Sequence, residues 1–198
     1  MSRLHVPLSC GTIRAMETPT VPEQETRRRL SPGWLAAGFI GLLVLALLGY
    51  GLTSHASLAV GSPAPEISLT ALDGGAINLA DQRGHVVVIN FFASWCPPCR
   101  EEAADVQQTW NDFQQRGVQF YGIAYKDAAP AAQAFLDEFG VTYPSAVDPG
   151  SRVARSYGIT GVPETFVIDQ QGQLVRHFPG PVTREQLSQE LEKLAPSN

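Results

Sequence analysis

One apolar stretch that runs straight into a cysteine pair constrains the fold of this 198-residue chain more than any other feature. Residues 85–92 read His-Val-Val-Val-Ile-Asn-Phe-Phe, a nearly continuous apolar run with the length of a strand. Such a strand is buried on both faces, so it predicts the centre of a sheet that helices cover. Ala-Ser-Trp-Cys-Pro-Pro-Cys follows at once, and prolines at the first helical positions predict that a helix begins directly after Cys96.

The Cys-x-x-Cys spacing of Cys96 and Cys99 predicts a redox-active pair at the start of this helix. The helix dipole and the unpaired N–H groups of the first turn favour the thiolate of Cys96, which we expect to be exposed and to be the nucleophile. Cys99, one turn into the helix, is expected to be more buried and to resolve the mixed disulfide that Cys96 forms with a partner. Pro97 and Pro98 support the helix start, and Trp95 is expected to cover the pair or to pack beside it.

Two other uses of a Cys-x-x-Cys pair stay open at this point, a metal site and a structural bridge. A structural zinc site usually combines two such pairs or adds histidines at ligand spacing, whereas this chain has one pair and its histidines, at positions 5, 55, 85 and 177, do not cluster. A copper site lacks a His or Met beside the pair. The redox interpretation is therefore preferred, and no metal is expected.

The rest of the C-terminal part alternates strands and helices. Its periodicity and turn residues predict, in chain order, a hairpin, the helix after the cysteines, a strand, a second helix, a short helix, two strands and a last helix that opens with a capping box. The expected ranges are 67–70 and 76–79, 97–116, 118–124, 130–139, 148–158, 165–168, 174–178 and 183–194. Gly117 and Gly140 are expected to end the first two long helices. This alternation predicts an α/β fold.

Residues 34–52 form a run of nineteen residues without a charge. As a helix they would span about 28 Å at ~1.5 Å per residue, which matches the apolar core of a bilayer. Arg27, Arg28 and Arg29 precede the run, so the positive-inside rule predicts a cytoplasmic N-terminus and an extracytoplasmic position for the residues after the run. A cleaved signal peptide is the alternative, but its apolar region is usually only about 7–15 residues long. We therefore expect an uncleaved, single-pass signal-anchor helix.

These features divide the chain into four parts. Residues 1–33, rich in Pro, Thr, Ser and charge, are expected to be a disordered cytoplasmic tail, 34–52 a transmembrane helix, 53–62 a linker and 63–195 a folded domain. Residues 60–198 carry nine basic and sixteen acidic side chains, a net charge of −7. Such a surface has no electrostatic attraction for a phosphate backbone, so a nucleic-acid-binding protein is disfavoured.

Residues 60–195 resemble the membrane-anchored thioredoxin-like family of TlpA, ResA and DsbE (CcmG) proteins. The segments that carry the resemblance are Trp-Cys-Pro-Pro-Cys at 95–99, Gly-Val-Pro-Glu-Thr-Phe-Val-Ile-Asp at 161–169, Tyr-Lys-Asp at 125–127 and Arg-His at 176–177. The Pro-Glu-Thr-Phe and Tyr-Lys-Asp segments are most similar to the DsbE branch, thiol reductants of cytochrome c maturation. The resemblance implies a thioredoxin fold, an α/β fold with a central mixed sheet flanked by helices, with an N-terminal β-hairpin and a central αβ insertion.

The resemblance also implies roles for residues around the pair. Val162 and Pro163 match the position where these folds hold a cis proline opposite the disulfide, which exposes backbone groups for strand-like pairing with an incoming peptide. Glu102 matches an acid that would manage the proton of Cys99 or disfavour the thiolate by like-charge repulsion, although a solvated first-turn glutamate also stabilises a helix dipole. Glu164 is the candidate for partner recognition.

Asn90 stands where ordinary thioredoxins keep a buried aspartate, so a different group must deprotonate Cys99. The function that the resemblance implies is that of a membrane-tethered thiol–disulfide oxidoreductase whose only redox group is its own Cys96–Cys99 disulfide, with no further cofactor. As partners it implies a membrane electron donor of the CcdA or DsbD type and, as substrate, the oxidised Cys-x-x-Cys-His of apocytochrome c or a dedicated intermediary.

Three other functions use some of the same residues. A disulfide-introducing oxidase would share the site and differ in reduction potential. A peroxidase is disfavoured, because the Pro and Thr that lead into a lone cysteine in peroxiredoxins are absent. A non-catalytic haem or copper chaperone would use His177 or the two thiols as ligands.

Overall fold

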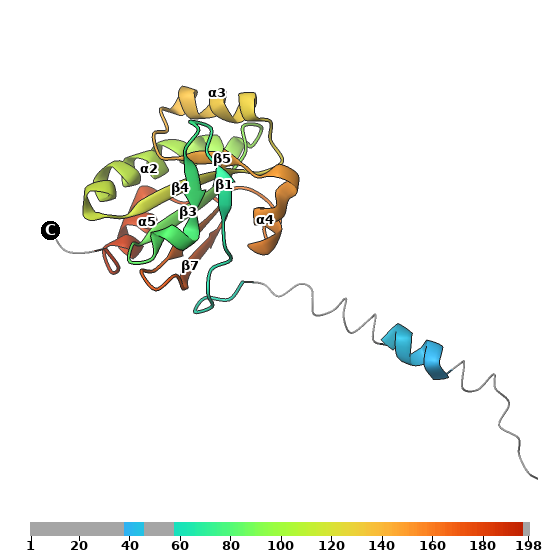
Figure 1. The fold of residues 1–198 in the computed structure, drawn as a ribbon. Coiled ribbons are helices and arrows are strands. Elements are labelled where there is room, and N and C mark those ends of the chain that lie inside the picture. Colours follow the sequence, from blue (N-terminus) through green and yellow to red (C-terminus); the bar gives the residue numbers. More distant parts are fainter. Residues whose placement is uncertain (1–37, 46–57, 196–198) are drawn as a thin grey trace, which may run out of the picture. The chain divides into compact units, whose positions relative to one another are not determined.

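The computed structural model describes residues 38–45 and 58–195 (Figure 1). Residues 38–45 are helical and belong to one unit, and residues 58–195 belong to a second, compact one. In these two ranges, no helix combines the length and the apolarity that crossing a membrane requires. The predicted tail 1–33, the predicted membrane helix 34–52 apart from its middle, and residues 53–57 of the linker lie outside the described residues, so these interpretations stay predictions.

A five-stranded mixed sheet forms the centre of the second unit, with the strand order β5-β4-β3-β6-β7. Its strands are β3 (Val87–Phe92), β4 (Gln119–Ala124), β5 (Ser145–Val147), β6 (Glu164–Ile168) and β7 (Leu174–Pro179). β3 pairs in parallel with β4 and antiparallel with β6, and every residue of β3 is buried. The continuous apolar run therefore occupies the middle of the sheet, as predicted.

Helices and a hairpin surround this sheet (Figure 1). They are the hairpin of β1 (Ser68–Thr70) and β2 (Ala76–Asn78), the helices α2 (Pro97–Phe113), α3 (Ala129–Phe139), α4 (Arg152–Ser156) and α5 (Arg184–Leu191), and the 3-10 turns η1 (Leu79–Gln82), η2 (Gln114–Arg116) and η3 (Pro149–Ser151). Gly117 and Gly140 have φ angles of 77° and 62°, a left-handed conformation that favours glycine, and they end η2 and α3 as expected. Thr183 and Gln186 form the predicted capping box of α5.

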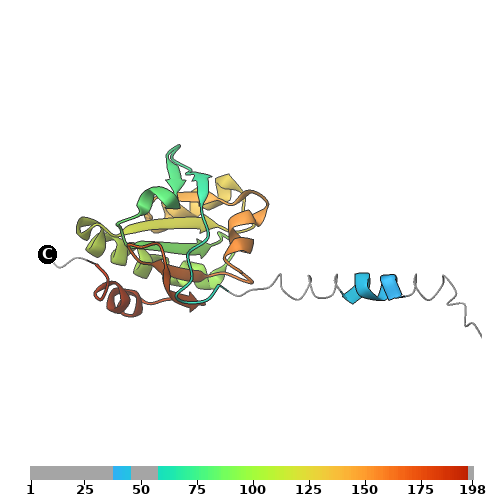
Figure 2. The same cartoon turned by 60° about the horizontal axis from the view of Figure 1, so that its bottom comes forward.

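The side chains of β3 alternate between two apolar cores. Val87, Ile89 and Phe91 pack in one core with residues of the β1–β2 hairpin and α4, whereas Val88 packs in the other with residues of α2 and α5. Figure 2 shows the hairpin and α5 on opposite sides of the sheet. Because both faces of the sheet are covered at β3, apolar residues occupy nearly every position of this strand. A third cluster, near the start of α2, contains Phe92 and both cysteines of the pair.

β5, an edge strand that pairs in parallel with β4, is not among the strands predicted above. Its three residues are too few for a period of two to be visible. Gly122 of β4 lies opposite Ser145, and a Cβ atom at Gly122 would collide with the Ser145 hydroxyl, so glycine permits this pairing. In chain order α3 and β5 lie between β4 and α4.

The buried side chain of Asp148, directly after β5, connects this edge strand to α4. Its carboxylate accepts hydrogen bonds from the N–H groups of Arg152, Val153 and Ala154, at 3.0, 3.1 and 2.8 Å. We expect Asp148→Ala to lower the free energy of unfolding by about 2 kcal/mol, because these helix-start donors lose their acceptor. Urea denaturation measures the change, and Asp148→Asn, which keeps a carbonyl acceptor, should lose less. An alanine variant as stable as the native chain would contradict this role.

Candidate functional site

Cys96 and Cys99 form a disulfide at the N-terminus of α2, a few residues after the end of β3. Cys96 is the N-cap residue, and its Sγ accepts a hydrogen bond from the N–H of Cys99 at 3.2 Å. Pro97 and Pro98 occupy the first two helical positions. The central strand thus fixes where the helix begins. Because Pro97 and Pro98 have no N–H, the helix directs the N–H of Cys99 at the Cys96 sulfur, an arrangement that favours a thiolate there after reduction.

The expectation that Cys96 is exposed is wrong for the oxidised pair. Cys96 is 2% exposed and Cys99 1%, so both sulfur atoms are almost completely covered. The reason is the third apolar cluster, in which Phe92 at the end of β3 and Phe135 of α3 pack with both cysteines, and Val162 packs against the same cluster. The burial comes from elements that are distant in sequence, which the helix-start pattern alone does not reveal.

Residues 160–162, called here the 160–162 loop, bring a backbone carbonyl to the disulfide. The carbonyl oxygen of Val162 lies 3.4 Å from Cys96 Sγ, although the two residues are 66 positions apart in the chain. The Val162–Pro163 peptide bond is cis, as the resemblance implies. The structure therefore brings together Cys96, Cys99, Val162 and Pro163, which the sequence analysis assigned to one site.

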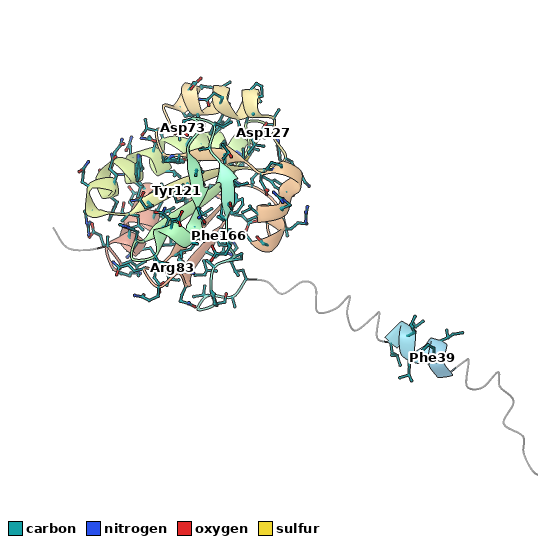
Figure 3. All side chains as sticks on the ribbon, viewed as in Figure 1. Phe39, Asp73, Arg83, Tyr121, Asp127 and Phe166 are labelled. Carbon is teal, nitrogen blue, oxygen red and sulfur yellow. A yellow bond between two sulfur atoms is a disulfide. The ribbon has the colours of Figure 1, made fainter. Side chains whose placement is uncertain are left out.

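A turn between β4 and α3 holds the residues just before Cys96. Asp127 accepts hydrogen bonds from the Ser94 N–H at 2.6 Å and the Ser94 hydroxyl at 3.0 Å, and Figure 3 labels it at the start of α3. Trp95 is 57% exposed, and its indole N–H donates to the carbonyl of Lys126 at 3.2 Å. Trp95 thus lies on the surface beside the pair and is not packed in the core.

The sequence analysis assigned Asp127 no role at the site. A usable signal is nevertheless present, because Ser94 and Asp127 each follow a buried strand, and β3 and β4 are parallel neighbours. The carboxyl ends of parallel strands lie at the same edge of a sheet, where side chains from different loops meet.

The buried acid of the site is Glu102, one turn after Cys99 on α2. Its carboxylate accepts hydrogen bonds from the side-chain amide of Asn90 and from the N–H of Val182, both at 2.8 Å. Burial raises the pKa of Glu102 from 4.5 to about 7, and the two hydrogen bonds oppose this rise only in part. Asn90 of β3 thus donates a hydrogen bond that positions the side chain of Glu102 on α2. A solvated first-turn glutamate would be exposed instead.

Glu164, the candidate for partner recognition, points into the domain. Its side chain is only 9% exposed, and its Oε2 lies 2.7 Å from Nε2 of His177. Its Oε1 accepts the N–H of Thr160 at 3.2 Å. Both carboxylate oxygens therefore make contacts within the domain, next to the loop that approaches Cys96.

Side chains that could bind a metal ion do not gather in the described residues. Within residues 38–45 and 58–195, no three His, Cys, Asp or Glu side chains are grouped so that they could hold a metal ion. His177 is engaged with Glu164, and both cysteine sulfurs are in the disulfide.

The raised pKa of Glu102 predicts a specific pH dependence of stability. Between pH 4.5 and about 7 the folded protein holds a proton on Glu102 that the unfolded chain has released, so stability falls as the pH rises through this window. The fall should be about 3 kcal/mol, from the size of the shift. Glu102→Gln, which is neutral throughout, should not show this fall in urea denaturation of the oxidised protein. Parallel pH profiles for the two proteins would contradict the assignment.

Comparison with known proteins gives a consistent result. Residues 60–177 match the AhpC/TSA family. The thiol-disulfide oxidoreductase ResA of Geobacillus thermodenitrificans is 34% identical over 160 residues, which are 78% of this chain and 92% of that protein. The thiol:disulfide interchange protein HelX of Rhodobacter capsulatus is 33% identical over 166 residues, 82% of this chain and 92% of that protein.

A solved structure agrees with the sequence relatives. The crystal structure of a thiol:disulfide interchange protein of the thioredoxin family from Chlorobium tepidum has a TM-score of 0.62 and 32% sequence identity, and the match covers 69% of this chain and 97% of that one. The thioredoxin fold and the resemblance to TlpA, ResA and DsbE proteins are thereby confirmed. The chain belongs to the AhpC/TSA family and is a thioredoxin-fold thiol–disulfide oxidoreductase of the ResA, HelX and DsbE type, whose substrates are protein thiols and disulfides.

Proposed function

We propose that the Cys96–Cys99 pair reduces disulfides of extracytoplasmic proteins, with the oxidised Cys-x-x-Cys-His of apocytochrome c or a dedicated intermediary as substrate. The observation that carries the proposal is the approach of the Val162 carbonyl to Cys96 Sγ, 3.4 Å away, at the N-terminus of α2. A backbone carbonyl beside a reactive sulfur offers an extended peptide a partner for strand-like hydrogen bonding. Trp95, exposed at the same place, adds apolar surface for the docked peptide.

The reaction is a two-electron exchange in two substitutions at sulfur. The Cys96 thiolate attacks one sulfur of the substrate disulfide, a mixed disulfide forms, and the other substrate sulfur leaves as a thiolate. The Cys99 thiolate then attacks Cys96 Sγ, which releases the second substrate thiolate and closes the Cys96–Cys99 disulfide. The substrate has gained two electrons, and the pair has lost them.

Glu102 is suited to the proton transfer that the second step needs. Cys99 must lose its proton before it attacks, and a base works best when its pKa lies near the working pH. Burial brings the pKa of Glu102 to about 7, and Asn90 and Val182 hold its carboxylate in place on the same helix, one turn after Cys99. In this proposal Glu102 therefore replaces the buried aspartate of ordinary thioredoxins.

A reductant outside the cytoplasm needs a supply of electrons. A membrane dithiol donor of the CcdA or DsbD type would reduce the Cys96–Cys99 disulfide by the reverse sequence of substitutions. The uncharged run at 34–52, preceded by three arginines, supports a single-pass tether in the bacterial cytoplasmic membrane with the thioredoxin domain on the extracytoplasmic side. Tethering raises the effective concentration of the domain toward membrane-bound partners.

Cytochrome c maturation is the preferred pathway because of particular segments of the chain. Pro-Glu-Thr-Phe at 163–166 and Tyr-Lys-Asp at 125–127 are the segments most similar to the DsbE branch. In the structure Val162, the residue before the first segment, contacts Cys96 Sγ, and Asp127 of the second segment accepts a hydrogen bond from Ser94, two residues before Cys96. The segments that are most similar to the DsbE branch are therefore connected to the surroundings of the reactive pair through these two contacts.

Single cysteine substitutions separate the two chemical roles. Cys99→Ser should accumulate a mixed disulfide between Cys96 and a protein substrate, because the resolving thiol is gone, whereas Cys96→Ser should form none. Both should reduce insulin disulfides about a hundredfold more slowly, or worse, than the native chain. Non-reducing gel electrophoresis and insulin turbidity measure these outcomes.

The matched control is Cys10→Ser, which removes the third cysteine of the chain and should leave both readouts unchanged. A stable mixed disulfide through Cys99 in the Cys96→Ser variant would reverse the assignment of nucleophile and resolving thiol.

Deletion of the gene should lower membrane-bound c-type cytochromes, measured by haem staining after electrophoresis. Expression of the native chain should restore them, and Cys96→Ser, expressed at the same level, should not. Normal cytochrome levels in the deletion strain would exclude the pathway while leaving the exchange chemistry intact.

Measurement of the reduction potential of the Cys96–Cys99 pair determines the direction of electron flow. A reductant of this fold is expected below about −200 mV, whereas a potential near about −120 mV would indicate a disulfide-introducing oxidase instead.

A further inference from the structure

The partly buried contact between Glu164 and His177 has no role in the steps above. Glu164 is the first residue of β6, and His177 lies on the neighbouring edge strand β7. Their side chains meet at 2.7 Å between Oε2 and Nε2, and they are 9% and 30% exposed. A carboxylate can only accept a hydrogen bond, so the Nε2 atom of His177 carries the hydrogen and donates it.

The imidazole ring of His177 is fixed independently of this hydrogen bond. It stacks on the ring of Phe166, with the two centroids 4.3 Å apart and the planes only 7° from parallel. The two residues are direct partners in the register of β6 and β7. Phe166 is completely buried, and Figure 3 labels it within the folded domain. The sheet and this stack therefore set the place of the Nε2 donor.

The other oxygen of Glu164 holds the 160–162 loop. Its Oε1 accepts the N–H of Thr160 at 3.2 Å and, more weakly, that of Gly161 at 3.5 Å. The next residue is Val162, whose carbonyl lies 3.4 Å from Cys96 Sγ. One carboxylate thus connects a rigid strand on one side with the backbone that faces the reactive sulfur on the other.

We infer that His177 is a positioning residue for protein substrates. It holds Glu164, Glu164 holds the backbone of the 160–162 loop, and the loop presents the Val162 carbonyl to an incoming peptide beside Cys96. The inference rests on the proposed docking role of Val162 and extends it to a residue two strands away from the disulfide. The contacts of His177 described above are with Glu164 and Phe166 and not with the sulfur atoms, so its loss should affect docking of a protein more than the exchange chemistry.

The positioning role of His177 depends on the hydrogen that its Nε2 atom donates to Glu164. Without it, Oε2 of Glu164 would be a buried charge lacking its partner, and the carboxylate would turn toward solvent or toward other donors. Either movement takes Oε1 away from Thr160 and Gly161. The loop then loses its two side-chain hydrogen bonds, although the apolar core beneath it stays in place.

The test compares three variants in the purified full chain. His177→Phe keeps a flat ring against Phe166 but has no donor, His177→Gln places an amide N–H near the position of Nε2, and Arg176→Gln changes an exposed neighbour on the same strand. Amide hydrogen exchange of Thr160 and Gly161 reports on the loop without any need for activity. Reduction of insulin and of a small aromatic disulfide then separates protein docking from sulfur chemistry.

In His177→Phe we expect the two amides to exchange about tenfold faster, and KM for insulin to rise about fivefold with kcat within about twofold. The rate with the small disulfide should stay within about twofold, because that substrate does not pair with the loop backbone. His177→Gln should restore both readouts to near native values, and Arg176→Gln should behave as the native chain does. If His177→Phe does not fold, His177→Asn, whose amide is too short to reach Glu164, replaces it.

Native exchange rates and native KM in a folded His177→Phe would overturn the inference, as would a folded His177→Gln that recovers neither. An equal loss of rate with insulin and with the small disulfide would also overturn it, because the residue would then act on the chemistry. If the native chain itself fails to reduce insulin, the proposed function falls, and the exchange rates of Thr160 and Gly161 still decide whether His177 holds the loop.

Discussion

The reactive site of this structure depends on two backbone segments that both contact the sulfur atom of Cys96. Cys96 receives the N–H of Cys99 from its own helix and the carbonyl of Val162 from a loop 66 residues away, at 3.2 and 3.4 Å. β3 and β6, which are antiparallel neighbours, deliver these two segments to the same end of the sheet. A donor group on one side and an acceptor group on the other define a site that can stabilise a thiolate and dock a peptide backbone.

The electrostatics of the site follow from where its acid is placed. Asn90 occupies the middle of the central strand, where an ionised side chain without a partner would be costly, and it donates a hydrogen bond to Glu102. The acid then lies on α2, the helix that also carries Cys99, so the base and the thiol it would serve move as one rigid element. Burial of that acid brings its pKa close to neutral pH, which suits proton transfer better than an ordinary carboxylate does.

Much of this arrangement is predictable from sequence, and the exceptions have physical causes. β3, α2 and the capping box of α5 are each predictable from a few neighbouring residues. The signals are an apolar run for β3, two prolines at the helix start for α2 and a Thr-x-x-Gln pattern for the capping box. β5 is too short to show a period. The burial of Cys96, the contact of Asp127 with Ser94 and the inward direction of Glu164 all depend on packing between distant segments, which only the assembled sheet brings together. The resemblance to a family located the residues of the site but not the directions of their side chains.

The burial of the disulfide has a consequence for selectivity. Reduction of the pair requires a thiolate to approach Cys96 in line with the sulfur–sulfur bond, and only 2% of Cys96 is exposed. A free small thiol that diffuses past the surface meets almost no target. A partner that binds beside Trp95 and the 160–162 loop can use its docking energy to reach the sulfur. Access to the sulfur, and not only the reduction potential, therefore limits which surrounding thiols can donate electrons to the oxidised pair.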